Sequence, residues 1–340
     1  MWIEWLDLIF MLIIILISAE LLTNGLEYFG EKIGISEGVT GSIFAAIVTA
    51  LPETTVPILA IFAGTSDRTL NEEISVGAIL GAPLMLSTLA ISFMALFAIN
   101  QRGIFGKIKP EVVGLKRDLD FFLVAFLIAA VAMFVPLNPI ILRLSISLFL
   151  VLIYVVYLLK TVQASKQLVL KGHKVCPDEP LYLTQIGLKN NSLTLLMQLI
   201  LGVVLLIMGA QGFIHGVEDI SKELHISALL LALLIIPIAT ELPEKFNSIL
   251  WVRKNKDTLA SGNITGAMVF QGTLLPALGI LLTPWQPSRY VLTGVIVTFI
   301  AACWLRVNAA VEGTRILVLL MNGVLYLVYL VMALYLFGIF

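Results

Sequence analysis

One short motif occurs twice inside apolar sequence, and it constrains this chain more than any other feature. Thr49-Ala50-Leu51-Pro52-Glu53 is followed 191 positions later by Thr240-Glu241-Leu242-Pro243-Glu244. Proline lacks the amide N–H that continues a helix. A carboxylate within a membrane is energetically costly, and where one occurs it usually has a function. Two copies of a proline-broken helix that carries a carboxylate, one in each half of a membrane protein, are what a two-fold symmetric cation pathway requires.

The composition places the chain in a membrane. Of its 340 residues, 59% are hydrophobic and 13% are charged, and the mean hydropathy is +1.03. A soluble core cannot hide so much apolar surface. The net charge of −1 gives no reason to expect a nucleic acid as partner. Cys176 falls in a polar stretch and Cys303 in an apolar one, so no disulfide framework is implied.

Ten apolar segments are long enough to cross a bilayer, since each holds roughly 17 to 25 residues and the hydrocarbon core is ~30 Å thick. They cover residues 8–29, 38–63, 74–98, 121–136, 140–159, 193–214, 227–251, 259–282, 290–305 and 316–338. The first lacks the basic region and cleavage site of a signal peptide, so we expect it to remain as a membrane helix. The predicted fold class is an all-α membrane protein with ten transmembrane helices.

The distribution of lysine and arginine predicts how these helices are oriented. If both termini lie outside the cell, the cytoplasmic loops hold 16 basic residues and the external loops hold four, while Lys245 falls within a span. Cytoplasmic loops are enriched in lysine and arginine. We therefore expect both termini outside.

The two halves of the chain are related by an internal repeat. The matched residues include Gly25 with Gly216, Glu27 with Glu218, Gly77 with Gly262 and Gly81 with Gly266. Each copy holds five spans, an odd number, so the second must be inserted upside down, as an inverted-topology repeat. We expect a first five-helix repeat at 1–160, a cytoplasmic connector at 161–192 and a second five-helix repeat at 193–340.

The repeated motif offers oxygen ligands. Pro52 and Pro243 each leave one helix carbonyl without its partner. Thr49 lies four residues before Glu53, and Thr240 has the same spacing to Glu244, so each hydroxyl shares a helix face with a carboxylate. Hard cations such as Na⁺ and Ca²⁺ take several ligands of this kind.

The residues from Glu20 through Gly25 to Thr49-Ala50-Leu51-Pro52-Glu53 resemble the first alpha repeat of the cation/calcium exchanger superfamily, which includes the sodium/calcium exchangers. There the helix motif reads Gly-Thr-Ser-Leu-Pro-Glu, and the next helix carries Gly-Asn-x-x-Gly-Ser-Asn-x-Phe-Asn. The similarity covers about 20–91 and 211–282, with Gly262-Asn263-Ile264-Thr265-Gly266-Ala267-Met268-Val269-Phe270-Gln271 in the place of that second motif.

The resemblance implies a secondary active antiporter, not an enzyme. It would exchange Na⁺ or H⁺ for Ca²⁺ by alternating access, with the first and sixth spans as the sliding gate and no resident cofactor. Glu53 and Glu244 would be the central metal ligands. Thr49, Thr240, Glu241 and Gln271 are the further expected cation ligands, together with carbonyls of the broken helices.

The chain departs from the family pattern at several ligand positions. Ala82 and Ala267 replace the serines of the second motif, and Leu86 replaces its final polar residue in the first half. Glu241 replaces the serine before Leu-Pro, which adds a carboxylate to the second half. Lys245 lies four residues after Glu241, in the order that favours an ion pair. Such a site would suit monovalent cations or protons, which is an alternative to Ca²⁺.

Other residues have two interpretations each. Glu20 is a wall of the pathway or a packing residue, and Asn263 is an ion ligand or a hydrogen-bond partner of a neighbouring helix. The repeated glycines at four-residue spacing are expected to permit close helix contacts; they are Gly77, Gly81, Gly262 and Gly266.

Other classes of protein fit the sequence less well than an antiporter. An intramembrane enzyme needs a nucleophile with a base or paired aspartates, and the predicted spans contain no buried Asp and no Ser/His pair. A channel needs a continuous polar lining, whereas the polar residues of these spans concentrate at one depth. A transport-silent family member with a binding or regulatory role remains as the alternative, because ligands are lost. The connector has no room for the calcium-sensing domain of some eukaryotic relatives. We expect a multi-pass protein of a prokaryotic cell membrane, in contact with lipid and inorganic cations.

Overall fold

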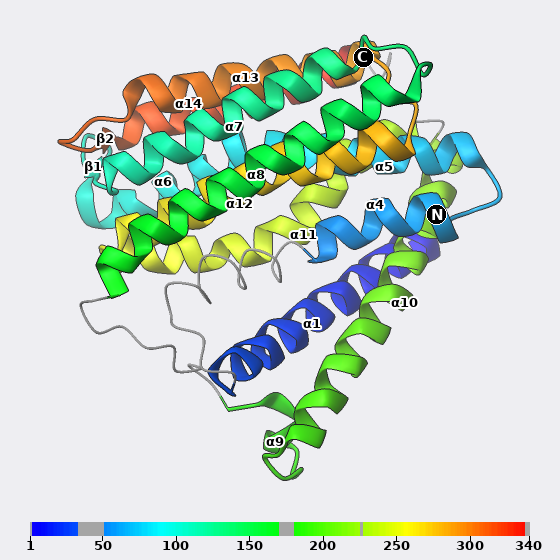
Figure 1. Cartoon of the computed structure of the whole chain (residues 1–340), viewed down its shortest axis with the longest axis horizontal. Helices are drawn as coiled ribbons and strands as arrows, with labels where there is room; N and C mark the ends of the chain where they lie inside the picture. The colour runs from blue at the N-terminus through cyan, green and yellow to red at the C-terminus, as the bar shows by residue number, and fades with distance from the viewer. Residues whose placement is uncertain (1, 33–50, 170–179, 225–226, 337–340) are drawn as a thin grey trace.

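The computed structural model describes residues 2–32, 51–169, 180–224 and 227–336, and these are mostly helical (Figure 1). The helices of the first half are α1 (Trp2–Lys32), α4 (Leu51–Ala63), α5 (Arg68–Met85), η2 (Leu86–Ala90), α6 (Ile91–Arg102), α7 (Val112–Ala132) and α8 (Ile140–Val169). Those of the second half are α9 (Tyr182–Gln185), α10 (Ser192–Leu224), α11 (Ala228–Arg253), α12 (Asp257–Leu282), α13 (Arg289–Asn308) and α14 (Ile316–Leu336). Two short strands, β1 (Lys107–Ile108) and β2 (Thr314–Arg315), pair antiparallel.

Seven helical stretches in the described part are long and apolar enough to cross a membrane. They lie at Trp5–Leu22, Arg68–Arg102, Ile140–Thr161, Ser192–Glu223, Asp257–Leu282, Arg289–Asn308 and Ile316–Tyr335. Shorter apolar stretches lie at Thr54–Ala63 and Ala228–Pro237. The chain is therefore an integral membrane protein, as its composition predicts. The finer expectation of ten spans in two inverted repeats stays a prediction.

Helix α7 begins nine residues earlier than the sequence predicts, at Val112 instead of 121. Glu111 caps its start, since the carboxylate accepts hydrogen bonds from the amides of Val113 and Gly114. Lys116 and Arg117, which we expected in a loop, are therefore on the helix. So is Asp118, which is buried. The statement that the spans contain no buried aspartate is thus wrong for this helix.

Helices α1 and α10 pack on each other along their length and lie together on one side of the molecule (Figure 1). Three apolar side chains of α1, seven residues apart, face three glycines of α10: Leu8, Ile15 and Leu22 lie opposite Gly216, Gly209 and Gly202. A Cβ atom at any of these glycines would lie within 2.9 Å of its partner side chain. The missing side chains let the two helices approach closely and fix their antiparallel register.

Helix α5 packs on α11 through a similar contact. A Cβ atom on Gly77 would lie 2.6 Å from the Cβ of Ala232, and one on Gly81 would clash with the carbonyl oxygen of Leu233. The predicted role of these two glycines is confirmed. Their repeat partners, Gly262 and Gly266, make no such close contact with the described residues. Nothing there lies within 4 Å of a Cβ on Gly262, and a Cβ on Gly266 would have only the hydroxyl of Tyr157 nearby, at 3.6 Å.

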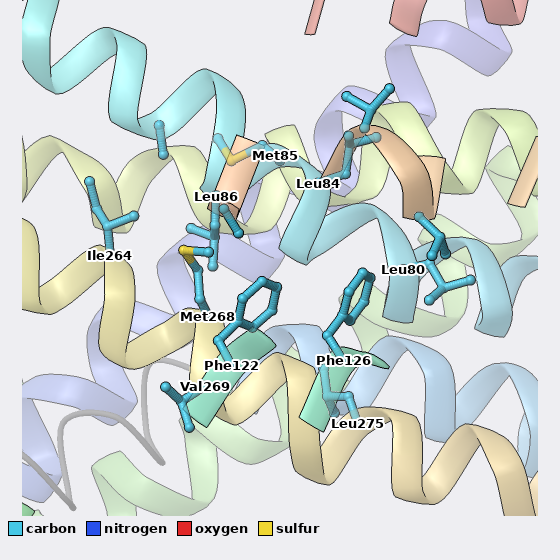
Figure 2. Close-up of a cluster of buried hydrophobic side chains, with 14 of the residues drawn as sticks. Leu80, Leu84, Met85, Leu86, Phe122, Phe126, Ile264, Met268, Val269 and Leu275 are labelled. Atoms are coloured by element: carbon cyan, nitrogen blue, oxygen red, sulfur yellow. The ribbon is translucent and has the colours of Figure 1, made fainter. Parts of the chain in front are cut away.

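The main apolar core lies among α5 to α8 and α11 to α14. Phe122 and Phe126 of α7 stack with their centroids 5.1 Å apart. Phe122 lies beside Met268 and Val269 of α12, and Phe126 lies beside Leu275 of the same helix (Figure 2). Gly272 lets the ring of Phe122 approach α12. This packing holds α12 in place beside α7 and α8.

Helices α5 and α6 are joined by one π-helical turn, η2, that follows Pro83. A π turn leaves backbone groups out of the regular helical pattern. Asn322 of α14 compensates, since its side-chain amide donates to the carbonyls of Ser87 (2.7 Å) and Ala301 (3.2 Å). The buried amide therefore ties α14 to this turn and to α13.

Three connections meet at one end of the bundle, where β1 follows α6 and β2 precedes α14 (Figure 1). Arg102, at the end of α6, forms two 2.7 Å hydrogen bonds to the carboxylate of Asp257, at the start of α12. The same guanidinium also donates to the carbonyls of Lys107 and Val252.

At the connection between α12 and α13, Arg143 of α8 donates to the carbonyls of Thr283 and Pro284.

Candidate cation site

Helix α11 carries most of the predicted site. Its first turn is capped by Ser227, whose hydroxyl accepts from the amide of Leu229, and the carboxylate of Glu73 on α5 accepts from the same amide at 3.3 Å. The helix is assigned without interruption from Ala228 to Arg253. It therefore continues past Pro237 and Pro243, and the expected break is not seen there. Each proline removes one backbone hydrogen bond without ending the helix.

A buried ion pair occupies the middle of this helix. The ammonium of Lys245 lies 3.3 Å from a carboxylate oxygen of Glu241, and the two side chains are 3% and 1% exposed. The predicted pair is thus present, in the four-residue spacing that places both side chains on one face. Two charges removed from water are stable only together, and loss of one partner from such a pair typically costs about 3–5 kcal/mol.

Asn263 of α12 faces α11. Its side-chain amide donates a 2.9 Å hydrogen bond to the hydroxyl of Ser248, which is fully buried. Of the two interpretations of Asn263, the structure shows the hydrogen bond to a neighbouring helix. That bond joins α12 to α11 at Ser248, which lies about one turn after Lys245.

Gln271 lies on α12 two turns beyond Asn263, and its side chain is buried. Its amide oxygen has no hydrogen-bond partner among the described residues. Buried amide oxygens are nearly always bonded, and one that is not is commonly explained by an ion or water. Gln271 therefore retains the properties of an oxygen ligand.

The remaining predicted ligands are placed only by their helices. Thr49 lies outside the described residues. Glu53 lies on α4, while Thr240 and Glu244 lie on α11, and the side chains of these three are also outside the described part. Among described residues, no group of three or more His, Cys, Asp or Glu side chains gathers as a metal site.

Glu20 of α1 is exposed and faces the connector instead of α11. Its carboxylate accepts a 2.8 Å hydrogen bond from the hydroxyl of Tyr182 on α9. Next to it, Asn24 accepts from the side-chain amide of Gln198 on α10 and from the backbone amide of Tyr182. This part of the connector therefore fastens the adjacent ends of α1 and α10, although the sequence predicts a solvated segment there.

Sequence reasoning missed a second buried carboxylate. Asp118 of α7 accepts a 2.8 Å hydrogen bond from the hydroxyl of Thr265 on α12 and forms a 3.1 Å ion pair with Arg117. The signal for its burial was present, because Asp118 shares a helix face with Phe122 and Ala125, four and seven residues later. The cluster of charges at 116–120 suggested a loop instead.

A protein-family model and several known proteins match this chain. The family model described as "Sodium/calcium exchanger protein" matches residues 3–162 and 194–338. The chain is 27% identical to the inner membrane protein YrbG of Escherichia coli (strain K12) over 320 residues, 90% of each chain. It is 26% identical to CaxA of Alkalimonas amylolytica over 279 residues, 80% of this chain and 79% of that one.

A solved structure shares the fold. The crystal structure of the H⁺/Ca²⁺ exchanger CAX superposes with a TM-score of 0.64 at 16% identity, over 97% of this chain and 88% of that chain. The family model covers most of this chain, including both Leu-Pro-Glu motifs. On this evidence the chain belongs to the sodium/calcium exchanger protein family, within the cation/calcium exchanger superfamily.

Proposed function

We propose that this protein is a secondary active cation antiporter that exchanges Ca²⁺ for Na⁺ or H⁺ by alternating access around Glu53 and Glu244. The observation that carries the proposal is the same Leu-Pro-Glu motif on α4 and on α11, in a chain that belongs to the exchanger family. Thr49, Thr240 and Gln271 complete the oxygen shell. Carboxylate, hydroxyl and amide oxygens are the ligands that these hard cations take.

The proposal includes two inverted five-helix repeats. Corresponding helices pack on corresponding partners in the two halves: α4 on α5 and α11 on α12, then α7 on α8 and α13 on α14. The family model matches the two halves as separate blocks, 3–162 and 194–338. Both observations support a repeat whose boundaries lie near 1–160 and 193–340, with 161–192 as the connector.

The proposed orientation has both termini outside. The connections after α6, α11 and α13 meet at one end of the bundle, through the Arg102–Asp257 pair and the β1–β2 ladder. If the chain crosses the membrane ten times, these follow the third, seventh and ninth spans, so all three belong on one side. They also carry the excess of basic residues that marks the cytoplasm.

The alternating motion is assigned to the α1–α10 pair. These helices are joined to each other by glycine contacts and by α9, whose backbone amides donate to Asn24 of α1 and Gln198 of α10. They adjoin the body of the protein mainly through α4, one of the two motif helices. Movement of the pair as a unit would open the motif helices to one side or the other.

A second candidate function is exchange of monovalent cations or protons without Ca²⁺. The buried Glu241–Lys245 pair favours it, because a fixed ammonium beside Glu244 lowers the negative charge available to a divalent ion. A test that separates the two is Ca²⁺ uptake into proteoliposomes of the purified protein, driven in turn by outward Na⁺ and H⁺ gradients. Uptake under one gradient supports Ca²⁺ exchange and names its coupling ion. Absence of Ca²⁺ uptake together with Na⁺/H⁺ exchange supports the second candidate, and absence of all flux contradicts both.

A further inference from the structure

We propose that Asn263 and Ser75 are equivalent positioning residues for cation exchange, one in each half of the chain. Each holds the Leu-Pro-Glu helix of its own half on the helix that follows it, at the residue four positions after the motif glutamate. That residue is Ser248 on α11 and Pro57 on α4. The inference rests on the proposed function, to which it adds the side chains that keep the ligand-bearing helices in register.

The contact in the second half joins α12 to α11. The side-chain amide of Asn263 donates to the hydroxyl of Ser248 at 2.9 Å, and Ser248 is fully buried. Four residues rise about 6 Å along a helix axis, so the bond lies one turn beyond Glu244 in the motif helix. Helix α12 also carries Gln271, whose buried amide oxygen has no hydrogen-bond partner among the described residues. The bond therefore links the helix of the motif to the helix of a further proposed ligand.

The contact in the first half joins α5 to α4 at the equivalent point. The hydroxyl of Ser75 lies 2.9 Å from the carbonyl oxygen of Pro57, and Ser75 is fully buried. It also lies 2.9 Å from the carbonyl oxygen of Asn71 in its own helix, so its one proton is shared between two acceptors. Pro57 follows Glu53 by four residues. Both motif helices are thus bonded to the next helix one turn after the motif.

The two donors do not occupy matching positions of the repeat. In the register that superposes the glycines of α5 on those of α12, Ser75 matches Ala260 and Asn263 matches Ala78. Each half therefore has one polar side chain and one buried alanine at these two positions, in opposite order. What the two halves share is the point on the motif helix that is bonded, and not the residue that bonds it.

A ligand shell that two helices share is sensitive to their relative position. A misplacement of about 1 Å at a reacting site can cost on the order of 100-fold in rate. Apolar packing is non-directional, whereas a hydrogen bond fixes the distance and the angle between two groups. A bond one turn from each motif therefore limits sliding and rotation of α11 on α12 and of α4 on α5.

Loss of either bond should weaken cation binding more than it slows turnover. In Asn263→Ala, α11 can shift relative to Gln271, and the KM for the transported cation should rise on the order of tenfold. Ser248→Ala breaks the same bond, so its KM should rise equally and the double variant should show no further increase. Ser75→Ala should raise the KM by a smaller factor, on the order of threefold, because its hydroxyl is shared between two carbonyls.

The test is the initial rate of radiolabelled Ca²⁺ uptake into proteoliposomes as a function of Ca²⁺ concentration, under the Na⁺ or H⁺ gradient that drives the wild type. Uptake of radiolabelled Na⁺ replaces it where the wild type exchanges monovalent cations alone. Ser145→Ala is the matched control, because that exposed hydroxyl bonds to the carbonyl of Ile141 in its own helix. Ser248→Thr keeps the hydroxyl and should have a KM nearer to that of the wild type than Ser248→Ala does.

A merely structural role gives a different result. Fewer folded molecules lower the maximal rate and leave the KM of the remaining ones unchanged. Thermal unfolding of each variant measures the folded fraction independently. If Asn263→Ala does not fold, Ser248→Ala removes the same bond and still decides the outcome.

Equal increases of the KM in the two single variants and in their double variant, with Ser145→Ala unchanged, support the inference. An unchanged KM in Asn263→Ala and Ser248→Ala, or increases that multiply in the double variant, overturn it. A KM of Ser75→Ala equal to that of the wild type overturns the equivalence of the two halves. A wild-type protein without cation exchange overturns the proposed function itself, and the wild-type measurement thereby distinguishes that failure from failure of the positioning role.

Discussion

Ile15 of α1 lies against Gly209 of α10 so closely that a Cβ atom on residue 209 would be 2.9 Å from Cγ1 of Ile15. The backbone of Ile15 is also near, with its nitrogen 3.2 Å from that Cβ position. No rotation of the isoleucine side chain can relieve both contacts. The α1–α10 pair is therefore sensitive to any side chain at this position.

We predict that Gly209→Leu separates α1 from α10 and destabilises the protein by about 1–3 kcal/mol or more, as overpacking does. The measurement is thermal unfolding of the purified protein in detergent. Val204→Leu, at a half-exposed site on the same helix, is the control and should change the midpoint little. Equal midpoints for the two variants would contradict the assigned contact.

The Arg102–Asp257 ion pair is expected to stabilise the end of the bundle where the connections after α6, α11 and α13 meet. Asp257→Asn leaves a largely buried guanidinium without its anionic partner, which costs about 3–5 kcal/mol. Lys107→Gln is the matched control, because its ion pair with Glu312 is exposed and such pairs contribute about 0–1 kcal/mol. Denaturant unfolding of both variants checks the difference, and a larger effect of Lys107→Gln would refute this assignment.

Asp118 and Thr265 should be energetically coupled across α7 and α12. Each single change, Asp118→Ala or Thr265→Val, removes one partner of the 2.8 Å hydrogen bond. The double variant should therefore lose less stability than the sum of the two singles, by about 0.5–3 kcal/mol. Additive losses in a double-mutant cycle would mean that this hydrogen bond does not hold α7 on α12.

Asn322 is predicted to stabilise the π turn. Asn322→Leu removes the donor to the carbonyls of Ser87 and Ala301, and an unpaired buried polar group costs about 1–3 kcal/mol. Asn308→Leu is the comparison, since the amide of Asn308 makes an exposed hydrogen bond within its own helix. Thermal unfolding should rank the two variants in that order, and the reverse ranking would be evidence against the role of Asn322.

Local patterns predicted much of the fold. Helix α11 extends over Ala228–Arg253 where 227–251 was expected, and α12 over Asp257–Leu282 where 259–282 was expected. The Glu241–Lys245 pair was also predictable, because a four-residue spacing on a helix fixes the distance between side chains. In each case, the information lies within a few residues of sequence.

Contacts between distant segments could not be predicted in this way. The Arg102–Asp257 pair joins residues 155 positions apart, and nothing near either residue identifies the other. The start of α7 was misplaced because charged residues that are paired in the fold resemble a solvated loop in the sequence. The hydrogen-bond donor to the buried Asp118 is Thr265, which lies 147 positions away.

The central claim is tested most directly by Ca²⁺ uptake into proteoliposomes with Glu53→Gln and Glu244→Gln beside the wild type. Glu72→Gln is the control, because Glu72 pairs with Arg68 at the start of α5, away from the motif. The account predicts gradient-driven uptake by the wild type and by Glu72→Gln, and its loss in both motif variants. Uptake at the wild-type rate in folded Glu53→Gln or Glu244→Gln protein would contradict it.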